Sequence, residues 1–376
     1  MLELIKVSKR IGNDVHIRDV SLELLPGSLN VLLGATLSGK TTLMRLMAGL
    51  ESPSTGEIRF NGVNVRGIPV QKRDVAMVYQ QFINYPSLTV YENIASPLRV
   101  AGLDKATIRQ RVHEAADLLR LGDYLQRLPA DLSGGQQQRT ALARALVKQA
   151  KLVLLDEPLA NLDYKLREEL RRELPGIFAK TGAILVYAST EPSEALLLGG
   201  NTATLHEGGI TQFGPAIEVF QRPVDLQTAR IFSDPPLNTL PVSKQGTELR
   251  CDDLVMTLPF QAAHAAHLPD GQYTLAIRPW HLLLDVPQKI AEHMTEEQMT
   301  YARLNAHVEV TEITGSETYV HVRLQGAQTQ RWVALVHGVK DLPADSPLRL
   351  AIDPAQIYLF DSHGKRCLAP TQREDV

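Results

Sequence analysis

Residues 34–41, GATLSGKT, have the types and spacing of a phosphate-binding loop. They follow a predicted strand and precede a predicted helix, TTLMRLMAGL, so the backbone N–H groups at the start of that helix would face a bound anion. Lys40 would reach the outer phosphates, and the Thr41 hydroxyl could bind Mg²⁺. The alternative is a glycine turn beside an unrelated lysine, and the strand–loop–helix context argues against it.

Two carboxylates follow a second apolar run in LVLLDEP, residues 152–158. Four apolar residues place this strand in the interior, so Asp156 would emerge at its carboxyl end, where open α/β sheets bind ligands. Asp156 could hold Mg²⁺ through water, and Glu157 could act as a general base toward an attacking water. An acidic pair after one strand is more often a cap or a solvated turn, but downstream of a phosphate loop it indicates a nucleotide site.

LSGGQQQR, residues 132–139, has two interpretations. Ser133 and Gln136 have capping-box spacing for the helix that continues through TALARALV. A cap does not require Gly134 and Gly135, however, because glycines weaken a first helical turn while leaving its amides approachable. A hydroxyl, two open amides and a helix N-terminus together predict a second anion site.

The turn VYASTEP, residues 186–192, follows a third apolar run and offers Ser189, Thr190 and Glu191. It contains no histidine, so it has no ring nitrogen that could exchange a proton near neutral pH. Thr190 could donate a hydrogen bond to a phosphate but could not titrate. Because loss of acid–base help typically costs about 10² to 10⁴ in rate, slow hydrolysis is expected; normal turnover with Thr190 and Glu191 substituting is the alternative.

The elements that would position these motifs are three strands that are apolar at both parities, within 28–34, 150–158 and 182–189. Such strands are typical of a mostly parallel sheet that is buried on both faces. Amphipathic helices alternate with them, and a helix-rich block spans roughly 87–150. We therefore expect an α/β domain over residues 1–235.

The character of the sequence changes after FSDPPLNTLP, residues 232–241. Beyond it, short runs such as QYTLAIRP and TYVHVRLQG alternate with a period near two. This spacing predicts an all-β second domain over 236–376, built as a small barrel or paired barrels.

Composition limits the function classes. The 376 residues exceed what one core usually supports, and a net charge of −3 with scattered basic residues does not favour nucleic-acid binding. The only cysteines, Cys251 and Cys367, do not form a disulfide framework. No signal peptide or membrane span is visible, so we expect a cytosolic chain whose membrane role depends on partners.

In combination, these motifs resemble those of ABC-type ATPase subunits over about residues 1–235. The resemblance assigns nucleotide binding to the Walker A segment: Gly34, Ala35, Thr36, Leu37, Ser38, Gly39, Lys40, Thr41 and Thr42. It assigns catalysis to Glu157 of Walker B, Gln80 of the Q-loop in VAMVYQQ, and Thr190, which falls where the family has its switch histidine. Thr41, Gln80 and Asp156 would be the metal ligands.

The resemblance assigns the remaining positions to nucleotide binding at a site formed by two subunits together. Ile11 falls where the family usually has an aromatic that stacks on adenine, and Ser133, Gly134, Gly135 and Gln136 form the signature, with Asp163 in the D-loop of ANLD. The implied fold is a RecA-like core with a helical subdomain. AIRPWHLLL and IYLFD resemble the OB- or TOBE-like barrel that follows in carbohydrate-type importer ATPases.

The resemblance also implies cofactors and partners. ATP with Mg²⁺ would be sandwiched between two ATPase subunits, with the Walker loops of one facing the LSGGQ of the other. Two transmembrane permease subunits and an extracytoplasmic solute-binding protein would complete the system. The chain would then lie peripherally on the cytoplasmic face of the inner membrane.

Three residues differ from the usual family pattern, at positions that would all contact the same bound nucleotide. Ile11 cannot stack as an aromatic would, which is worth about 1 to 3 kcal/mol, unless His16 or a partner substitutes. Leu37 replaces the middle glycine of the loop, and a positive φ there would cost about 1 to 2 kcal/mol. With Thr190, these changes predict a degenerate site in a chain that pairs with an unlike ATPase and completes its site through LSGGQ. A non-hydrolysing regulatory subunit and a fully active homodimer are the alternatives.

Aromatic residues gather in QFINYPSLTVYENI, which carries Phe82, Tyr85 and Tyr91. The resemblance places this segment in the groove that receives a permease helix, although each ring could equally be a core residue. The run of motifs looks most like ATPases of glycerol importers, with carbohydrate or glycerol phosphate as close seconds. A P-loop kinase or GTPase would have no use for LSGGQ, and soluble ABC proteins normally carry a coiled coil or two cassettes.

Overall fold

The computed structural model describes residues 1–81, 83–160, 162–179, 181–246, 248–251, 254–257, 268–284, 302–326 and 330–370. Phe82, one of the three aromatic residues predicted to face a permease, lies outside these ranges. No helix in the described ranges is both long enough and apolar enough to span a membrane.

The chain divides into two compact units, Met1–Ile217 and Glu218–Val376. Helix α8 (Leu226–Ile231) belongs to the second unit because the buried Arg278 guanidinium donates a hydrogen bond of 2.7 Å to the Phe232 carbonyl at the end of that helix. The two units therefore divide ahead of the proline-rich segment. The domain boundary near residue 235 stays a prediction.

The first unit is organised around a six-stranded sheet of order β10-β9-β3-β8-β7-β6. Its strands are β3 (Leu29–Leu33), β6 (Val75–Val78), β7 (Leu152–Asp156), β8 (Ile184–Ser189), β9 (Asn201–His206) and β10 (Gly209–Pro215). All neighbours are parallel except β10, which runs antiparallel to β9. The three predicted strands are confirmed, and every residue of β7 and β8 is buried. As a result, the loops that leave β3, β7 and β8 meet at the carboxyl end of the parallel strands.

A second, antiparallel sheet of order β2-β1-β4-β5 was not predicted. It comprises β1 (Leu2–Ile11), β2 (Asp14–Leu24), β4 (Thr55–Phe60) and β5 (Val63–Asn64). Buried residues of both sheets and of helix α1 (Lys40–Ala48) form one apolar core. The helix that starts at the phosphate loop is thus held between two sheets.

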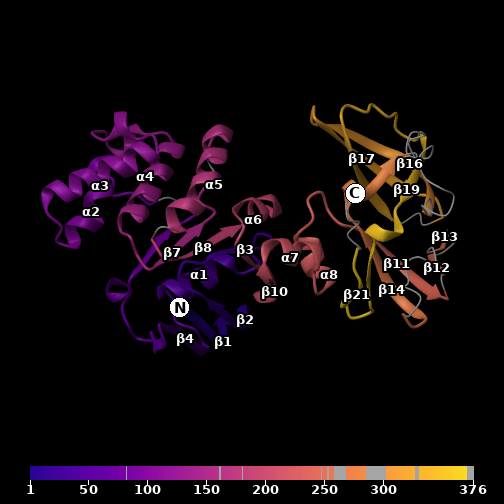
Figure 1. The fold of residues 1–376 in the computed structure, drawn as a ribbon, viewed down its shortest axis with the longest axis horizontal. Coiled ribbons are helices and arrows are strands. Elements are labelled where there is room, and N and C mark those ends of the chain that lie inside the picture. Colours follow the sequence, from indigo (N-terminus) through magenta and orange to yellow (C-terminus); the bar gives the residue numbers. More distant parts are fainter. Residues whose placement is uncertain are drawn as a thin grey trace. The chain divides into compact units, whose positions relative to one another are not determined.

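The predicted helix-rich block is confirmed by α2 (Val90–Val100), α3 (Lys105–Leu118) and α4 (Gly134–Val147), which Figure 1 shows grouped to one side of the parallel sheet. Helices α5 (Tyr164–Ala179) and α6 (Pro192–Leu198) follow β7 and β8. Thr89 caps α2 and Ser133 caps α4, each by a complete capping box. The start of the signature helix is therefore set by its own side chains.

In its described residues the second unit consists of two β-sheets together with α8, the end of α7 (Ala216–Gln221) and two short 3-10 turns, and this part of the fold prediction is also confirmed. One sheet has the order β13-β12-β11-β14-β20-β21, with β11 (Asn238–Gln245), β12 (Glu248–Cys251), β13 (Leu254–Thr257), β14 (Gly271–Ile277), β20 (Tyr358–Phe360) and β21 (Arg366–Leu368). The other has the order β15-β19-β16-β17-β18, with β15 (Leu282–Leu284), β16 (Ala302–Ile313), β17 (Glu317–Leu324), β18 (Arg331–His337) and β19 (Pro347–Ile352). The two sheets share a core around the fully buried Trp332.

Candidate nucleotide-binding site

The loop from Gly34 to Gly39 connects β3 to α1, and its two end glycines are sterically required. A Cβ on Gly34 would lie 2.5 Å from the Leu205 carbonyl oxygen. Gly39 has φ +108° and would bring a Cβ within 3.0 Å of the His16 carbonyl oxygen. The backbone is thus packed closely on one side, as expected for a loop whose amides must turn toward a ligand on the other.

The Lys40 side chain folds back into this loop. Its Nζ donates hydrogen bonds to the carbonyl oxygens of Gly34, at 2.8 Å, and Ala35, at 3.0 Å. Only 5% of Lys40 is exposed, and its Nζ lies 3.8 Å from Glu157 Oε1. The ammonium therefore sits within the loop that the sequence predicts to hold the outer phosphates, while Ala35, Thr36 and Leu37 remain exposed at the tip.

The three predicted metal ligands lie around one cavity of about 530 Å³, lined by Thr41, Gln80 and Asp156 among others. Thr41 Oγ1 donates a 2.8 Å hydrogen bond to Asp156 Oδ2, so the hydroxyl and the carboxylate are within reach of one cation. Gln80 Nε2 donates to Glu157 Oε2 at 2.9 Å. These oxygen donors suit Mg²⁺, which usually takes one or two carboxylates together with substrate phosphates. The residues therefore fit ATP with Mg²⁺.

Burial shifts all three charged groups of the site toward their neutral forms. It lowers the pKa of the Lys40 ammonium, although Glu157 and Asp156 oppose the shift. It raises the pKa of the Asp156 carboxyl, against the Thr41 hydrogen bond and Lys40. It also raises the pKa of the Glu157 carboxyl, with Lys40 again opposing. A bound phosphate and a divalent cation would supply the charges that this desolvated site lacks.

Glu157, the residue that follows β7, has an uncommon backbone conformation. Its φ is +48°, and its N–H donates to the Ala188 carbonyl at 3.2 Å. The bond continues the β7–β8 pairing as far as Glu157, and the positive φ then redirects the chain. The Asp156 and Glu157 carboxylates reach Thr41 and Gln80 respectively. A positive φ is unfavourable for a non-glycine residue, so it persists only where surrounding contacts hold it. Such residues are found most often at functional sites.

Thr190 follows the last residue of β8 and is exposed. The preceding carbonyl, that of Ser189, accepts a 3.3 Å hydrogen bond from the Gly34 N–H. The turn and the phosphate loop are thereby joined at their bases. The structure brings together the predicted loop, the acidic pair and Thr190.

The signature residues lie elsewhere, at the start of α4. Ser133 Oγ accepts from the Gln136 N–H at 3.3 Å, and Gln136 Oε1 accepts from the Ser133 N–H at 2.9 Å. In the part of the chain described, the side-chain hydrogen bonds of these two residues are with each other, and Gly134 is exposed. The capping-box interpretation is therefore confirmed, and the anion-site interpretation stays a prediction.

Three further predicted residues lie in the first unit. Ile11 is the last residue of β1, opposite Asp14, and 51% of it is exposed. Asp163 Oδ1 accepts a 3.0 Å hydrogen bond from the Leu166 N–H and so caps α5. Thr42 lies in the first turn of α1 and is partly buried.

Sequence reasoning missed the contact that closes the phosphate loop from outside. Gly208, in the turn between β9 and β10, donates its N–H to the Ser38 carbonyl at 2.9 Å and accepts from the Arg18 N–H at 2.9 Å. Gly208 has φ +77°, and a Cβ there would lie 2.4 Å from the His16 carbonyl oxygen. The only signal in the sequence was the glycine pair of HEGGI, which indicates a turn but not its partner.

The predicted permease-facing segment is tied to the signature helix. Asn84 Nδ2 donates to the Gln137 carbonyl at 2.8 Å, and the Arg144 guanidinium lies 5.0 Å from the ring centre of Tyr85, half of which is exposed. The Tyr91 ring makes an edge contact with His113 at 6.2 Å between ring centres. Tyr85 is therefore available for a partner, while Tyr91 packs within the helical block.

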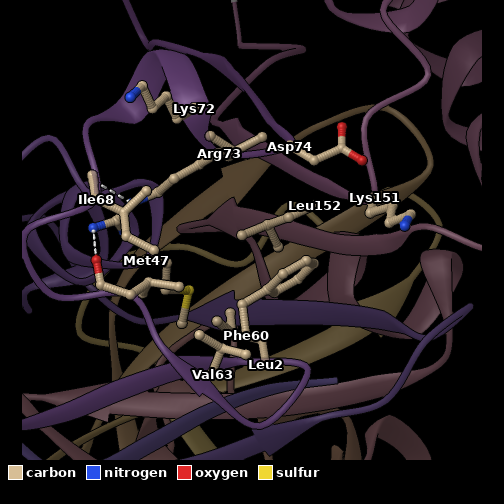
Figure 2. Close-up of a pocket in the computed structure, with 12 residues that line it drawn as sticks. Leu2, Met47, Phe60, Val63, Ile68, Lys72, Arg73, Asp74, Lys151 and Leu152 are labelled. Carbon is tan, nitrogen blue, oxygen red and sulfur yellow. Dashed lines mark hydrogen bonds between the residues drawn. The ribbon is translucent and has the colours of Figure 1, made fainter.

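A second cavity, of about 260 Å³, lies at the opposite edge of the parallel sheet, beside the amino ends of β6 and β7. Figure 2 shows the Phe60 ring and the Met47 thioether inside it, with Lys72 and Lys151 on opposite sides of its rim. Arg73 Nε donates to the Ile68 carbonyl at 2.9 Å, so this guanidinium is engaged within the protein. The cavity contains none of the predicted phosphate or metal residues.

Comparisons with known proteins support a nucleotide site. A family model of ABC transporters matches residues 17–160, and a model of the TOBE domain matches residues 275–360. The sn-glycerol-3-phosphate import ATP-binding protein of Rhizobium johnstonii is 34% identical over 366 residues, which cover 97% of this chain and 99% of that protein. The maltose/maltodextrin import ATP-binding protein of Escherichia coli K12 is 32% identical over 374 residues, 97% of each chain.

Among solved structures, a dimeric ATP-binding cassette in a post-hydrolysis state, bound to ADP and Pi, is similar to part of this chain. The TM-score is 0.54 at 26% identity, and the match covers 57% of this chain and 99% of that one. The α/β domain and the β-barrel TOBE domain that follows it thus agree with the fold predicted from the sequence.

Leu37 has φ +68° and is 97% exposed, so its backbone is strained while its side chain is not buried. Replacing Leu37 by Gly should raise the free energy of unfolding of the first unit by about 0.5 to 1 kcal/mol, because relief of strain exceeds the added chain entropy. Urea unfolding measures this. Thr36, the exposed neighbour without a positive φ, is the control, since Thr36→Gly should only destabilise. A loss of stability in both variants would show that Leu37 is not strained.

Proposed function

This chain belongs to the family of ABC transporter ATP-binding proteins, and from that premise we propose that it is the ATPase subunit of an importer for a polyol or sugar. The observation that carries the proposal is the meeting of Lys40, the Thr41–Asp156 pair and Glu157 at the carboxyl ends of three parallel strands. Lys40 would bind the outer phosphates and Thr41 with Asp156 would hold Mg²⁺. Glu157 would orient and deprotonate the attacking water.

Gln80 joins this chemistry to the membrane partner. Its amide nitrogen binds Glu157, and the segment that follows it carries Tyr85 and the hydrogen bond from Asn84 to α4. Movement of a permease helix against Tyr85 would thus reach both the general base and the signature helix. In this arrangement two permease subunits bind above the chain, which lies at the cytoplasmic face of the membrane, and an extracytoplasmic binding protein delivers the solute.

The chain's own Walker site turns over slowly in this proposal. Leu37 carries the strained backbone that a glycine would relieve, and Thr190 offers the γ-phosphate a hydrogen bond without a titratable proton. Ile11 adds no aromatic face for adenine. The general base Glu157 is intact, so hydrolysis is slowed rather than abolished.

The signature, by contrast, is complete, and its Ser133 and Gly134 are exposed at the start of α4. We place it opposite the Walker loops of an unlike ATPase subunit, where Ser133, the two glycine amides and the α4 N-terminus would bind that partner's γ-phosphate. Ser133 Oγ accepts a hydrogen bond in the capping box, so its hydroxyl proton can still be donated to this phosphate. The two ATP sites of the pair would then be unequal, and the site completed by this chain's signature would be the faster one.

Glycerol is the cargo we favour. Support comes from the resemblance of the segments around Gln80 and Thr190 to those of glycerol importers, and from the relatives named for import of sn-glycerol-3-phosphate, a phosphorylated polyol. No residue described above would touch the cargo. Its identity therefore depends on the permease and binding protein, and mass spectrometry of the native complex would identify those chains.

The pH dependence of hydrolysis tests the role of Glu157. The ionised carboxylate is the active form and its pKa is raised above the ordinary 4.5, so hydrolysis should fall with decreasing pH at a value above 4.5. Burial is the main cause of this upward shift and the Glu191 charge adds a small part of it, so Glu191→Gln should move the acid limb slightly to lower pH. The measurement is the single-turnover rate of ATP hydrolysis as a function of pH in the assembled complex. The Walker lysine of the partner ATPase is replaced, so that the rate reports on this chain's own site. An unmoved limb in Glu191→Gln would contradict the assignment of the limb to Glu157.

The division of roles between the two sites is tested by transport. In the assembled complex, Ser133→Ala should lower solute uptake about a hundredfold, because it removes a donor to charge developing at the faster site. Glu157→Gln should lower uptake by less than about threefold, because its own site contributes little. Strong loss in Glu157→Gln with no effect of Ser133→Ala would reverse the roles.

The control for Ser133→Ala is Asp104→Ala, which removes the side chain that caps α3, outside the segment that would face a permease. Both substitutions should destabilise their helices by about 1 kcal/mol. Only Ser133→Ala should affect uptake. Equal losses of uptake in the two variants would mean that helix stability, and not phosphate contact, explains the effect.

A further inference from the structure

A buried polar cluster lies directly beneath the turn that presents Thr190. Its members carry a charge or a hydroxyl and are each at most 7% exposed: Arg171 of α5, Tyr187 and Ser189 of β8, and Glu194 of α6. Glu194 Oε2 accepts hydrogen bonds from Ser189 Oγ at 2.5 Å and from the Tyr187 hydroxyl at 3.1 Å. Glu194 Oε1 accepts from Arg171 Nη2 at 3.2 Å.

The Ser189 hydroxyl connects this cluster to the turn. Its single proton is donated to Glu194, so its lone pairs are left to accept the Glu191 N–H, at 3.0 Å. The Glu194 N–H donates in turn to the Glu191 carbonyl at 3.2 Å. Both backbone groups of Glu191 are therefore fixed, and Thr190, between Ser189 and Glu191, has little freedom to move.

Arg171 makes this arrangement rigid from the other side. Its Nη1 donates to Glu168 Oε1 at 2.6 Å, and its Nη2 lies 3.6 Å from Glu191 Oε2. A buried ion pair of this kind is weak evidence for stability, since apolar residues of similar volume often serve as well. Its hydrogen bonds do, however, orient the carboxylates of Glu168 and Glu194, and its ion pair draws the Glu191 carboxylate toward the same guanidinium.

We propose that Ser189 and Glu194 are positioning residues that hold the Thr190 turn against the terminal phosphate of bound nucleotide. The inference rests on the proposed function, because it requires ATP in the Walker site. It adds that recognition of the γ-phosphate depends on a hydroxyl relay from Glu194 through Ser189 to the Glu191 amide.

The cluster offers a matched pair of variants. Ser189→Ala and Tyr187→Phe each remove one hydroxyl from the same oxygen, Glu194 Oε2, but only Ser189 also binds the turn. Ser189→Thr retains a hydroxyl at this position and is the conservative variant. Thermal unfolding of the full chain should show similar losses for Ser189→Ala and Tyr187→Phe.

The binding readout is the affinity of the full chain for Mg-ATPγS relative to Mg-ADP, measured by competition with a fluorescent nucleotide. Ser189→Ala should weaken Mg-ATPγS about tenfold, the equivalent of one hydrogen bond to a charged group, and leave Mg-ADP within about twofold. Tyr187→Phe should leave the ratio unchanged, and Ser189→Thr should restore it. Equal ratios in Ser189→Ala and Tyr187→Phe would overturn the proposal.

Hydrogen exchange of the nucleotide-free chain separates this inference from the proposed function. The Glu191 amide should exchange faster in Ser189→Ala and at the wild-type rate in Tyr187→Phe. An unchanged rate in Ser189→Ala would overturn the relay, even in a chain that binds nucleotide normally. A wild-type chain that bound neither nucleotide would contradict the proposed function, and with it any action of the relay on a phosphate.

Discussion

The candidate site depends on one constraint: the carboxyl ends of β3, β7 and β8 lie side by side at the same end of the parallel sheet. Because these strands are neighbours and run in the same direction, the loops that leave them must meet. The Gly34 N–H binds the Ser189 carbonyl, and the Glu157 N–H binds the Ala188 carbonyl. Main-chain hydrogen bonds therefore join the phosphate loop, the acidic pair and the Thr190 turn before any side chain is considered.

Charge is then concentrated where these loops meet. The Lys40 ammonium lies within the phosphate loop, near two carboxylates whose pKa values burial raises. Such a site is costly to maintain without ligand, because each ion is partly desolvated and none has its full complement of partners. Nucleotide phosphates and Mg²⁺ would balance these charges. The signature residues Ser133 to Gln136 on α4 carry no charged side chain, and in the proposed function they would complete the site of another subunit.

The sequence predicted the parts of the fold and site that depend on local pattern. Strands apolar at both parities and the capping box of Ser133 both follow from residue type at a known spacing. The antiparallel sheet of β1, β2 and β4 and the closure of the loop by Gly208 were missed, because both depend on pairing between distant segments. The Ser189–Glu194 relay was missed for a related reason, since nothing in STEPSE indicates that a glutamate would be buried against a strand.

The central claim is that the Lys40 ammonium is held in its loop for a nucleotide phosphate. Calorimetric titration of the full chain with MgATP tests this directly, with Lys40→Met as the variant and Lys72→Met, at the rim of the other cavity, as the control. We expect Lys40→Met to weaken binding by about 10- to 100-fold, as loss of a charge-assisted contact would, and Lys72→Met to bind as the wild type does. Equal affinity of Lys40→Met and the wild type for MgATP would contradict the account.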